Sequence, residues 1–120
     1  MKITDVDNAL EYFREAAAIH GEATESGNYK LGNKNYDLIV KSIDYLIKES
    51  AIDHLLKFLD DPNISVRVWA AAYLLPIYEK EALNTLLSIM QGNGIIAGNA
   101  QITIQEWKKG NLKNIRELYT

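Results

Sequence analysis

One turn constrains the fold of this chain more than any other feature of its sequence. An apolar segment at residues 55–59 runs into an Asp-Asp-Pro-Asn turn at residues 60–63, and a second apolar run follows at residues 64–75. Asn63 suits the N-cap of the second run, because its side-chain oxygen can accept from the backbone N–H groups that open a helix. Ala70 is small enough to let a neighbouring helix come close. The stretch therefore predicts two short antiparallel helices folded about the turn.

Apolar residues recur at steps of three and four along most of the chain, and no segment alternates as a strand does. The first helix is expected to end at residues 27–28, and a further turn is expected at residues 32–35, with Asn33 or Asn35 as the next N-cap. Pro76 should end or kink the fourth helix. The spacing predicts seven helices, at about residues 5–25, 36–48, 50–59, 64–78, 83–90, 95–109 and a last short one carrying Leu112, Ile115 and Leu118.

A shift of 30 residues aligns part of the chain with itself. Six positions match, among them Leu56 with Leu86 and Ala70 with Ala100, so two helical hairpins are expected. The period is shorter than the ~40–47 residues of full HEAT repeats, which indicates compact HEAT-like units. We therefore expect an all-α fold, a right-handed stack of short antiparallel helical hairpins forming a HEAT-like α-solenoid of about six to seven helices. The stack is expected to be one domain over residues 1–120.

The composition excludes several kinds of site. The chain has 120 residues and no Cys, which excludes disulfides, thiolate zinc sites and cysteine nucleophiles. Its first residues lack the apolar core of an export signal, and its longest apolar runs fall far short of the ~20 residues that span a bilayer. We therefore expect a soluble protein of the cytoplasm.

The net charge of −3 conceals a gradient along the chain. Acidic residues dominate residues 1–25, whereas residues 101–120 are mildly basic. Glu11, Glu15 and Glu22 are expected on the outer face of the first helix, where they would repel nucleic-acid phosphates and attract a basic protein. The simpler alternative is that both ends are merely solvated faces. On the first interpretation the partner is a protein, with no role for nucleic acid or membrane.

The spacing of the titratable side chains indicates no catalytic residue and no metal site. His20 and His54 each lack a second ligand at metal-binding spacing on their own helix face. The carboxylates of the first helix share a face, but an open stripe does not supply the dry environment that acid–base catalysis requires. The glycine-rich residues 92–98 lack the lysine and the preceding strand of a phosphate-binding loop. No cofactor is expected.

Several residues are assigned structural roles. An Arg on the first turn of a repeat helix commonly pairs with an acid of the preceding turn, so Arg67 is expected to bind Asp60 or Asp61. The glycines near the start of the sixth helix should allow close packing of Gly98 against a neighbour. The two Trp residues are expected to pack within or between helices. The structural set is Asn63, Arg67, Trp69, Ala70, Gly98 and Trp107.

The run at residues 63–75 combines with Ala82, Gly98, Ala100 and residues 107–110 into a wider pattern. The pattern continues upstream through Ala16, Ala17, Gly21, Ala23, Gly27, Asn33 and Asn35. Together these residues resemble a family of short bacterial HEAT-like proteins of unassigned function. The resemblance implies an all-helical fold without known catalytic residues, and small acidic proteins of this sort are similar to immunity proteins encoded beside bacterial toxins.

The leading functional hypothesis is therefore a non-catalytic binding protein, an immunity protein that covers a basic toxin domain with the acidic groups Glu11, Glu15 and Glu22. The alternative is a general interaction scaffold, or an accessory subunit of a bacterial complex that uses a concave repeat surface. A lyase or hydrolase subunit is a third class, for which no nucleophile, base and orienting group can be assembled from these residues.

Overall fold

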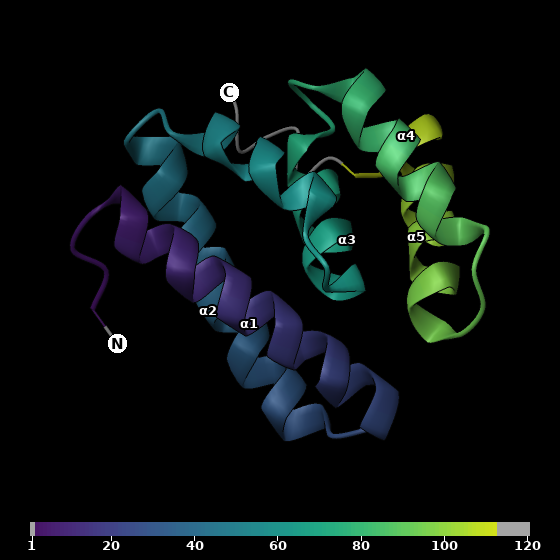
Figure 1. The fold of residues 1–120 in the computed structure, drawn as a ribbon, viewed down its shortest axis with the longest axis horizontal. Helices are drawn as coiled ribbons and strands as arrows, with labels where there is room; N and C mark the ends of the chain where they lie inside the picture. The colour runs from purple at the N-terminus through teal and green to yellow at the C-terminus, as the bar shows by residue number, and fades with distance from the viewer. Residues whose placement is uncertain (1, 113–120) are drawn as a thin grey trace. The chain divides into compact units, whose positions relative to one another are not determined.

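A computed structural model describes residues 2–112, and this part of the chain is entirely helical apart from its connecting turns. It contains six helices and no strand, which Figure 1 shows in chain order: α1 (Val6–Ser26), α2 (Tyr29–Lys48), the 3₁₀ helix η1 (Ile52–Asp60), α3 (Ile64–Leu74), α4 (Glu79–Met90) and α5 (Ile95–Lys108). The predicted all-α class is confirmed. The right-handed HEAT-like stacking stays a prediction, and the predicted last helix at Ile115 and Leu118 lies outside the described residues.

The chain divides by packing into two units, one from the N-terminus to Leu55 and the other from Leu56 onward. Helices α1 and α2 lie in the first unit, α3, α4 and α5 lie in the second, and η1 spans the boundary. The expectation of a single domain over residues 1–120 stays a prediction.

A two-residue turn joins α1 to α2. Gly27 has a φ of 72°, in the left-handed region that glycine enters without steric cost. The N–H of Asn28 donates to the carbonyl of Ala23 at 2.9 Å, which closes the last turn of α1 in a Schellman motif. The Asn28 side chain in turn accepts from the N–H of Leu31 at 3.2 Å, so the same residue caps the start of α2. Because the reversal needs only these two residues, α1 and α2 run side by side.

Helix α2 begins earlier than the sequence indicates, and the turn predicted at residues 32–35 was wrong. These residues are helical, and Asn28 is the N-cap instead of Asn33 or Asn35. Packing explains the difference, since a Cβ built at Gly32 would lie 3.8 Å from that of Ala23 in α1. Contact with α1 outweighs the low helix propensity of glycine and asparagine. The buried residues of the pair are mainly small or aliphatic, and include Leu10, Phe13, Ala17, Ile39, Ile43 and Leu46.

The segment after α2 forms a 3₁₀ helix where a short helix was predicted at residues 50–59. Ser50 adopts a φ of 54°, and the N–H of Ala51 donates to the carbonyl of Leu46 at 2.8 Å, which ends α2 abruptly. A 3₁₀ helix has three residues per turn, so side chains three apart lie on the same side. Ile52, Leu55 and Phe58 have this spacing and all three are buried.

The second unit is built around α4, which packs on both α3 and α5. Asn63 caps α3 as predicted, because its Oδ1 accepts from the N–H of Val66 at 3.1 Å. Helix α3 ends at Leu74, before Pro76, as expected for a residue that cannot continue a helix. The buried side chains come from all three helices and include Val66, Ala70, Leu74, Ala82, Leu86, Ala100 and Ile104.

Ala70 tests the packing of the second unit. It is fully buried in the middle of α3, so Ala70→Leu should lower the free energy of unfolding by roughly 1–3 kcal/mol as the core is overpacked. The control is Gln101→Leu, at an exposed position of α5 where the added bulk meets solvent. Urea denaturation monitored by circular dichroism gives both values. Equal unfolding midpoints for the two variants would show that Ala70 does not lie at a tight contact.

Two glycine-to-alanine variants should change the stability of the chain in opposite directions. Gly27→Ala should cost about 1 kcal/mol of stability, since alanine must enter the left-handed region. Gly98→Ala should instead stabilise by about 0.5–1 kcal/mol, because an added Cβ inside α5 meets no atom of the described residues within 4 Å. Thermal and urea unfolding of both variants provide the comparison. A loss of stability in Gly98→Ala would contradict the open space at this position.

Candidate functional site

The acidic stripe of α1 consists of Glu11, Glu15 and Glu22, and all three side chains are exposed. Glu11 and Glu15 are one turn apart, and Glu22 follows two turns later, so helical geometry places them on one face. Asp7 lies one turn before Glu11 and is also exposed. The structure thus places the three predicted partner-binding residues together on the surface of the first unit.

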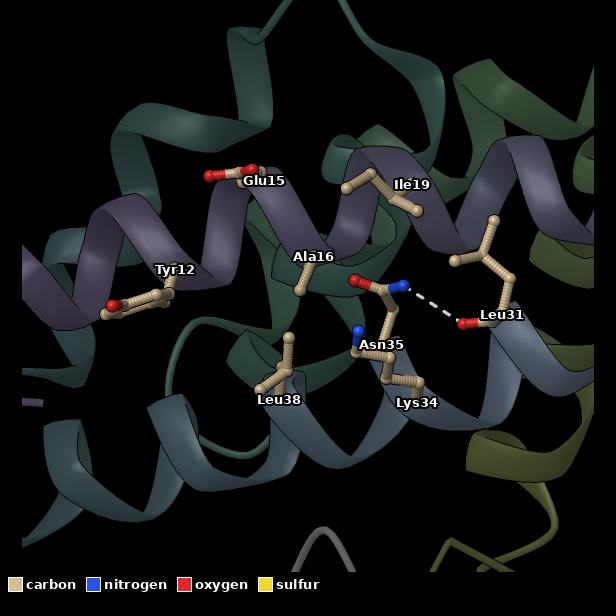
Figure 2. Close-up of a pocket in the computed structure, with 8 residues that line it drawn as sticks. All are labelled: Tyr12, Glu15, Ala16, Ile19, Leu31, Lys34, Asn35 and Leu38. Atoms are coloured by element: carbon tan, nitrogen blue, oxygen red, sulfur yellow. Dashed lines mark hydrogen bonds between the residues drawn. The ribbon is translucent and has the colours of Figure 1, made fainter. Parts of the chain in front are cut away.

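A groove opens between α1 and α2 beside this stripe, and sequence reasoning missed it. It has a volume of about 230 Å³. Its lining is mostly apolar, and Figure 2 shows the residues that α1 and α2 contribute: Tyr12, Glu15, Ala16 and Ile19 from α1, and Leu31, Lys34, Asn35 and Leu38 from α2. Glu15 therefore belongs both to the acidic stripe and to the wall of the groove.

The order of the lining residues follows from the antiparallel pairing of the two helices. Along the chain, Tyr12 and Leu38 lie farther from the turn that joins the two helices, whereas Ile19 and Leu31 lie nearer to it. One small side chain lies at the contact: Ala16 is buried, with only a methyl group facing the space that Figure 2 shows.

Asn35 is the one side chain of the groove that is both polar and buried, with 4% of its surface exposed. Its Nδ2 donates to the carbonyl oxygen of Leu31 at 3.0 Å. The Leu31 carbonyl fixes the orientation of the Asn35 amide. If the amide were flipped, its oxygen would face the carbonyl oxygen of Leu31 in place of the nitrogen. Figure 2 shows the nitrogen turned to Leu31 and the oxygen turned towards the space beside Ala16. The Asn35 oxygen has no hydrogen-bond partner among residues 2–112.

The groove was missed because residues 32–35 were assigned to a turn. With these residues in a helix, Asn35 falls one turn after Leu31 and one turn before Ile39, on the buried stripe of α2. A polar residue on an apolar helix stripe is the signal that could have pointed to the site. It is visible in the sequence only once the start of α2 at Tyr29 is known.

Two titratable groups of the first unit have shifted pKa values. Partial burial lowers the pKa of His20, whose backbone carbonyl accepts from the Thr24 hydroxyl at 2.9 Å. Partial desolvation raises the pKa of Tyr45, and the carboxylates of Glu49 and Asp5 raise it further. Neither group lines the groove.

The residues assigned structural roles lie in the second unit. The Trp107 side chain is buried, and its Nε1 donates to Oε2 of Glu79 at 2.8 Å, which ties the last turn of α5 to the first turn of α4. Trp69 is half-buried and stacks on Tyr73 of the same helix, with ring centroids 6.2 Å apart. These placements agree with packing within and between helices.

The structural roles expected for Gly98 and Arg67 have different outcomes. The predicted close approach of a neighbour at Gly98 was wrong for the described residues, since its Cβ position faces open space. The Nε atom of Arg67 is buried and has no hydrogen-bond partner among residues 2–112. Asp61 accepts from the N–H of Asn63 at 2.9 Å, which organises the turn before α3. Pairing of Arg67 with Asp60 or Asp61 stays a prediction.

The described residues contain no group of three or more His, Cys, Asp or Glu side chains placed to hold a metal ion. In the same part of the chain, no helix has both the length and the apolar character needed to cross a bilayer. No protein-family model, curated protein or solved structure matches this chain. The similarity to short bacterial HEAT-like proteins and to immunity proteins therefore stays a hypothesis based on the residues named above.

The His20 environment predicts a pH dependence of stability. The folded chain holds His20 neutral to a lower pH than the unfolded chain, so the unfolded state binds the proton first as the pH falls through about 6.5. Stability should decrease across this range and level off once the folded His20 is also protonated. His20→Gln should flatten the decrease between about pH 7.5 and pH 5.5, measured by urea unfolding at each pH.

The matched control is His54→Gln, which removes an exposed histidine of η1 and should keep the slope of the unaltered chain. Identical slopes for His20→Gln and the unaltered chain would contradict the assigned cause.

Proposed function

We propose that this chain is a non-catalytic binding module that takes a basic protein on the acidic stripe of α1. The most concrete form of the proposal is an immunity protein, which neutralises a bacterial toxin domain by binding it one to one. The observation that supports it is the alignment of Glu11, Glu15 and Glu22, all exposed, on one face of a capped helix. Charges arranged in this way raise the rate at which an oppositely charged partner arrives.

Helix α1 is capped at both ends and packed along one side. The helix has 21 residues, and Asp5 caps its start by accepting from the N–H of Asn8 at 2.7 Å. Its other end is closed by the Gly27 turn, and its buried side packs on α2. The helix backbone that carries the three glutamates is therefore formed before a partner arrives, which reduces the conformational entropy lost on binding.

A second candidate is a general interaction scaffold or an accessory subunit of a bacterial complex. The second unit favours it, because three large apolar side chains of α4 and α5 are exposed by 42% or more of their surface: Leu87, Ile95 and Ile102. Exposed apolar side chains of this size can contribute to a protein contact when they adjoin one another. On this alternative the partner binds the second unit and is insensitive to the charge of α1.

Charge reversal distinguishes the two candidates. Replacing Glu11, Glu15 and Glu22 together by Lys should slow association with the basic partner at least tenfold at low salt. The difference should shrink at 1 M salt, where the screening length falls to about 3 Å. The product of the adjacent gene is the first partner to test, by stopped-flow or surface-based kinetics. Circular dichroism should show unchanged helix content.

The matched control reverses three exposed carboxylates that lie elsewhere, Asp37, Asp53 and Glu81, and gives the same change in net charge. It should slow association far less than the reversal on α1. If both triple variants slow association equally, the result would contradict a site on the α1 face and indicate that only the net charge affects the association rate. A complex that ignores both reversals but is lost with Leu87→Ser or Ile102→Ser would support the second candidate.

A further inference from the structure

The groove between α1 and α2 has the size of a site for a single side chain. Its volume of about 230 Å³ is below the roughly 300–1,000 Å³ of pockets that enclose whole small-molecule ligands. It lies within the first unit, and both of its walls are helical. Anchors of protein interfaces commonly insert one large side chain into such a hollow.

The groove combines a mostly apolar lining with one hydrogen-bond acceptor turned inward, the side-chain oxygen of Asn35, while Glu15 and Lys34 are its charged lining residues. Ala16, Ile19, Leu31 and Leu38 supply aliphatic groups, and Tyr12 adds an aromatic ring. The Asn35 oxygen faces this space, as Figure 2 shows, and no donor among residues 2–112 reaches it. A ligand that covers this oxygen removes it from water, so a ligand that supplies one donor in an apolar body avoids leaving the oxygen unpaired in the complex.

This chemistry favours one kind of side chain over the others. An aliphatic side chain would fill the space but leave the Asn35 oxygen unpaired. A lysine or arginine head group brings a charge, and moving that charge from water to a mostly apolar lining costs free energy. A carboxylate has no donor to offer the Asn35 oxygen. The indole of tryptophan has a large apolar body, one N–H donor and no acceptor, which matches the groove.

We propose that the groove seats a tryptophan side chain of the basic partner, with the indole N–H donated to Oδ1 of Asn35. The inference rests on the proposed function, since the acidic stripe selects the partner while the groove anchors it. Glu15 connects the two, because it lies on the stripe and on the groove wall. The partner segment therefore carries basic residues on either side of its tryptophan.

Synthetic peptides test this with the full chain and without knowledge of the natural partner. The reference peptide has a central tryptophan with two lysines on each side. In the first variant peptide the tryptophan is 1-methylated and has lost its N–H, in the second it is leucine, and in the third the lysines are serines. Binding is followed by nuclear magnetic resonance, using the side-chain amide of Asn35 and the methyl groups of Ile19 and Leu38.

The reference peptide should shift these signals, and both the 1-methyl and the leucine peptides should bind about tenfold more weakly, as expected for loss of one hydrogen bond to a buried group. Asn35→Leu should weaken the reference peptide by a similar factor, with exposed Asn84→Leu of α4 as the matched control. Because Asn35→Leu alters a buried position, the 1-methyl peptide supplies the same test on the unaltered chain.

Three results would overturn the inference. One is equal affinity for the tryptophan, 1-methyl and leucine peptides, and another is signal shifts confined to α4 and α5. The third is a dimer of the chain that blocks the groove against the reference peptide. The peptide with serines in place of lysines separates the two proposals. If it binds as well as the reference peptide and binding still needs the indole N–H, the groove is supported and the acidic stripe is contradicted. A peptide whose binding needs its lysines but not its indole N–H supports the acidic stripe and contradicts the groove site.

Discussion

The packing of α1 on α2 is the contact on which the candidate site depends. Gly27 reverses the chain within two residues, and Asn28 both ends one helix and begins the next. The pair therefore starts in close contact at the turn, where Gly32 lies against Ala23. The same packing fixes the outer face of α1, which carries the acidic stripe, and the space between the helices, which holds the oxygen of Asn35. A change in the turn would alter the stripe and the groove together.

The sequence predicts helices well where apolar spacing and capping residues agree. The start of α3 at Asn63 and its end before Pro76 follow from local chemistry, since an asparagine side chain caps and a proline cannot continue a helix. The exposed positions of Glu11, Glu15 and Glu22 follow equally from the 3.6-residue period of α1. These features depend on residues within a turn or two of one another, which is why the sequence alone predicts them.

The rest depends on contacts between distant residues. The Gly and Asn residues at 32–35 favour a turn locally, yet they are helical because α1 packs against them. That error concealed Asn35, whose role is apparent only when Leu31 and Ile39 are one turn away on either side. Gly98 shows the opposite error, since a glycine within a helix indicated a close contact where the described residues leave open space. Tertiary packing, which the local pattern does not encode, decided each case.

We propose that one surface of the first unit combines long-range attraction by the α1 carboxylates with a short-range anchor between α1 and α2. The most direct test of this proposal is to measure intermolecular nuclear Overhauser contacts between the bound basic partner and a methyl-labelled chain. We expect contacts from an aromatic side chain of the partner to the methyl groups of Ile19, Leu31 and Leu38. Contacts confined to the methyl groups of Leu87, Ile95 and Ile102 would contradict it and place the partner on the second unit.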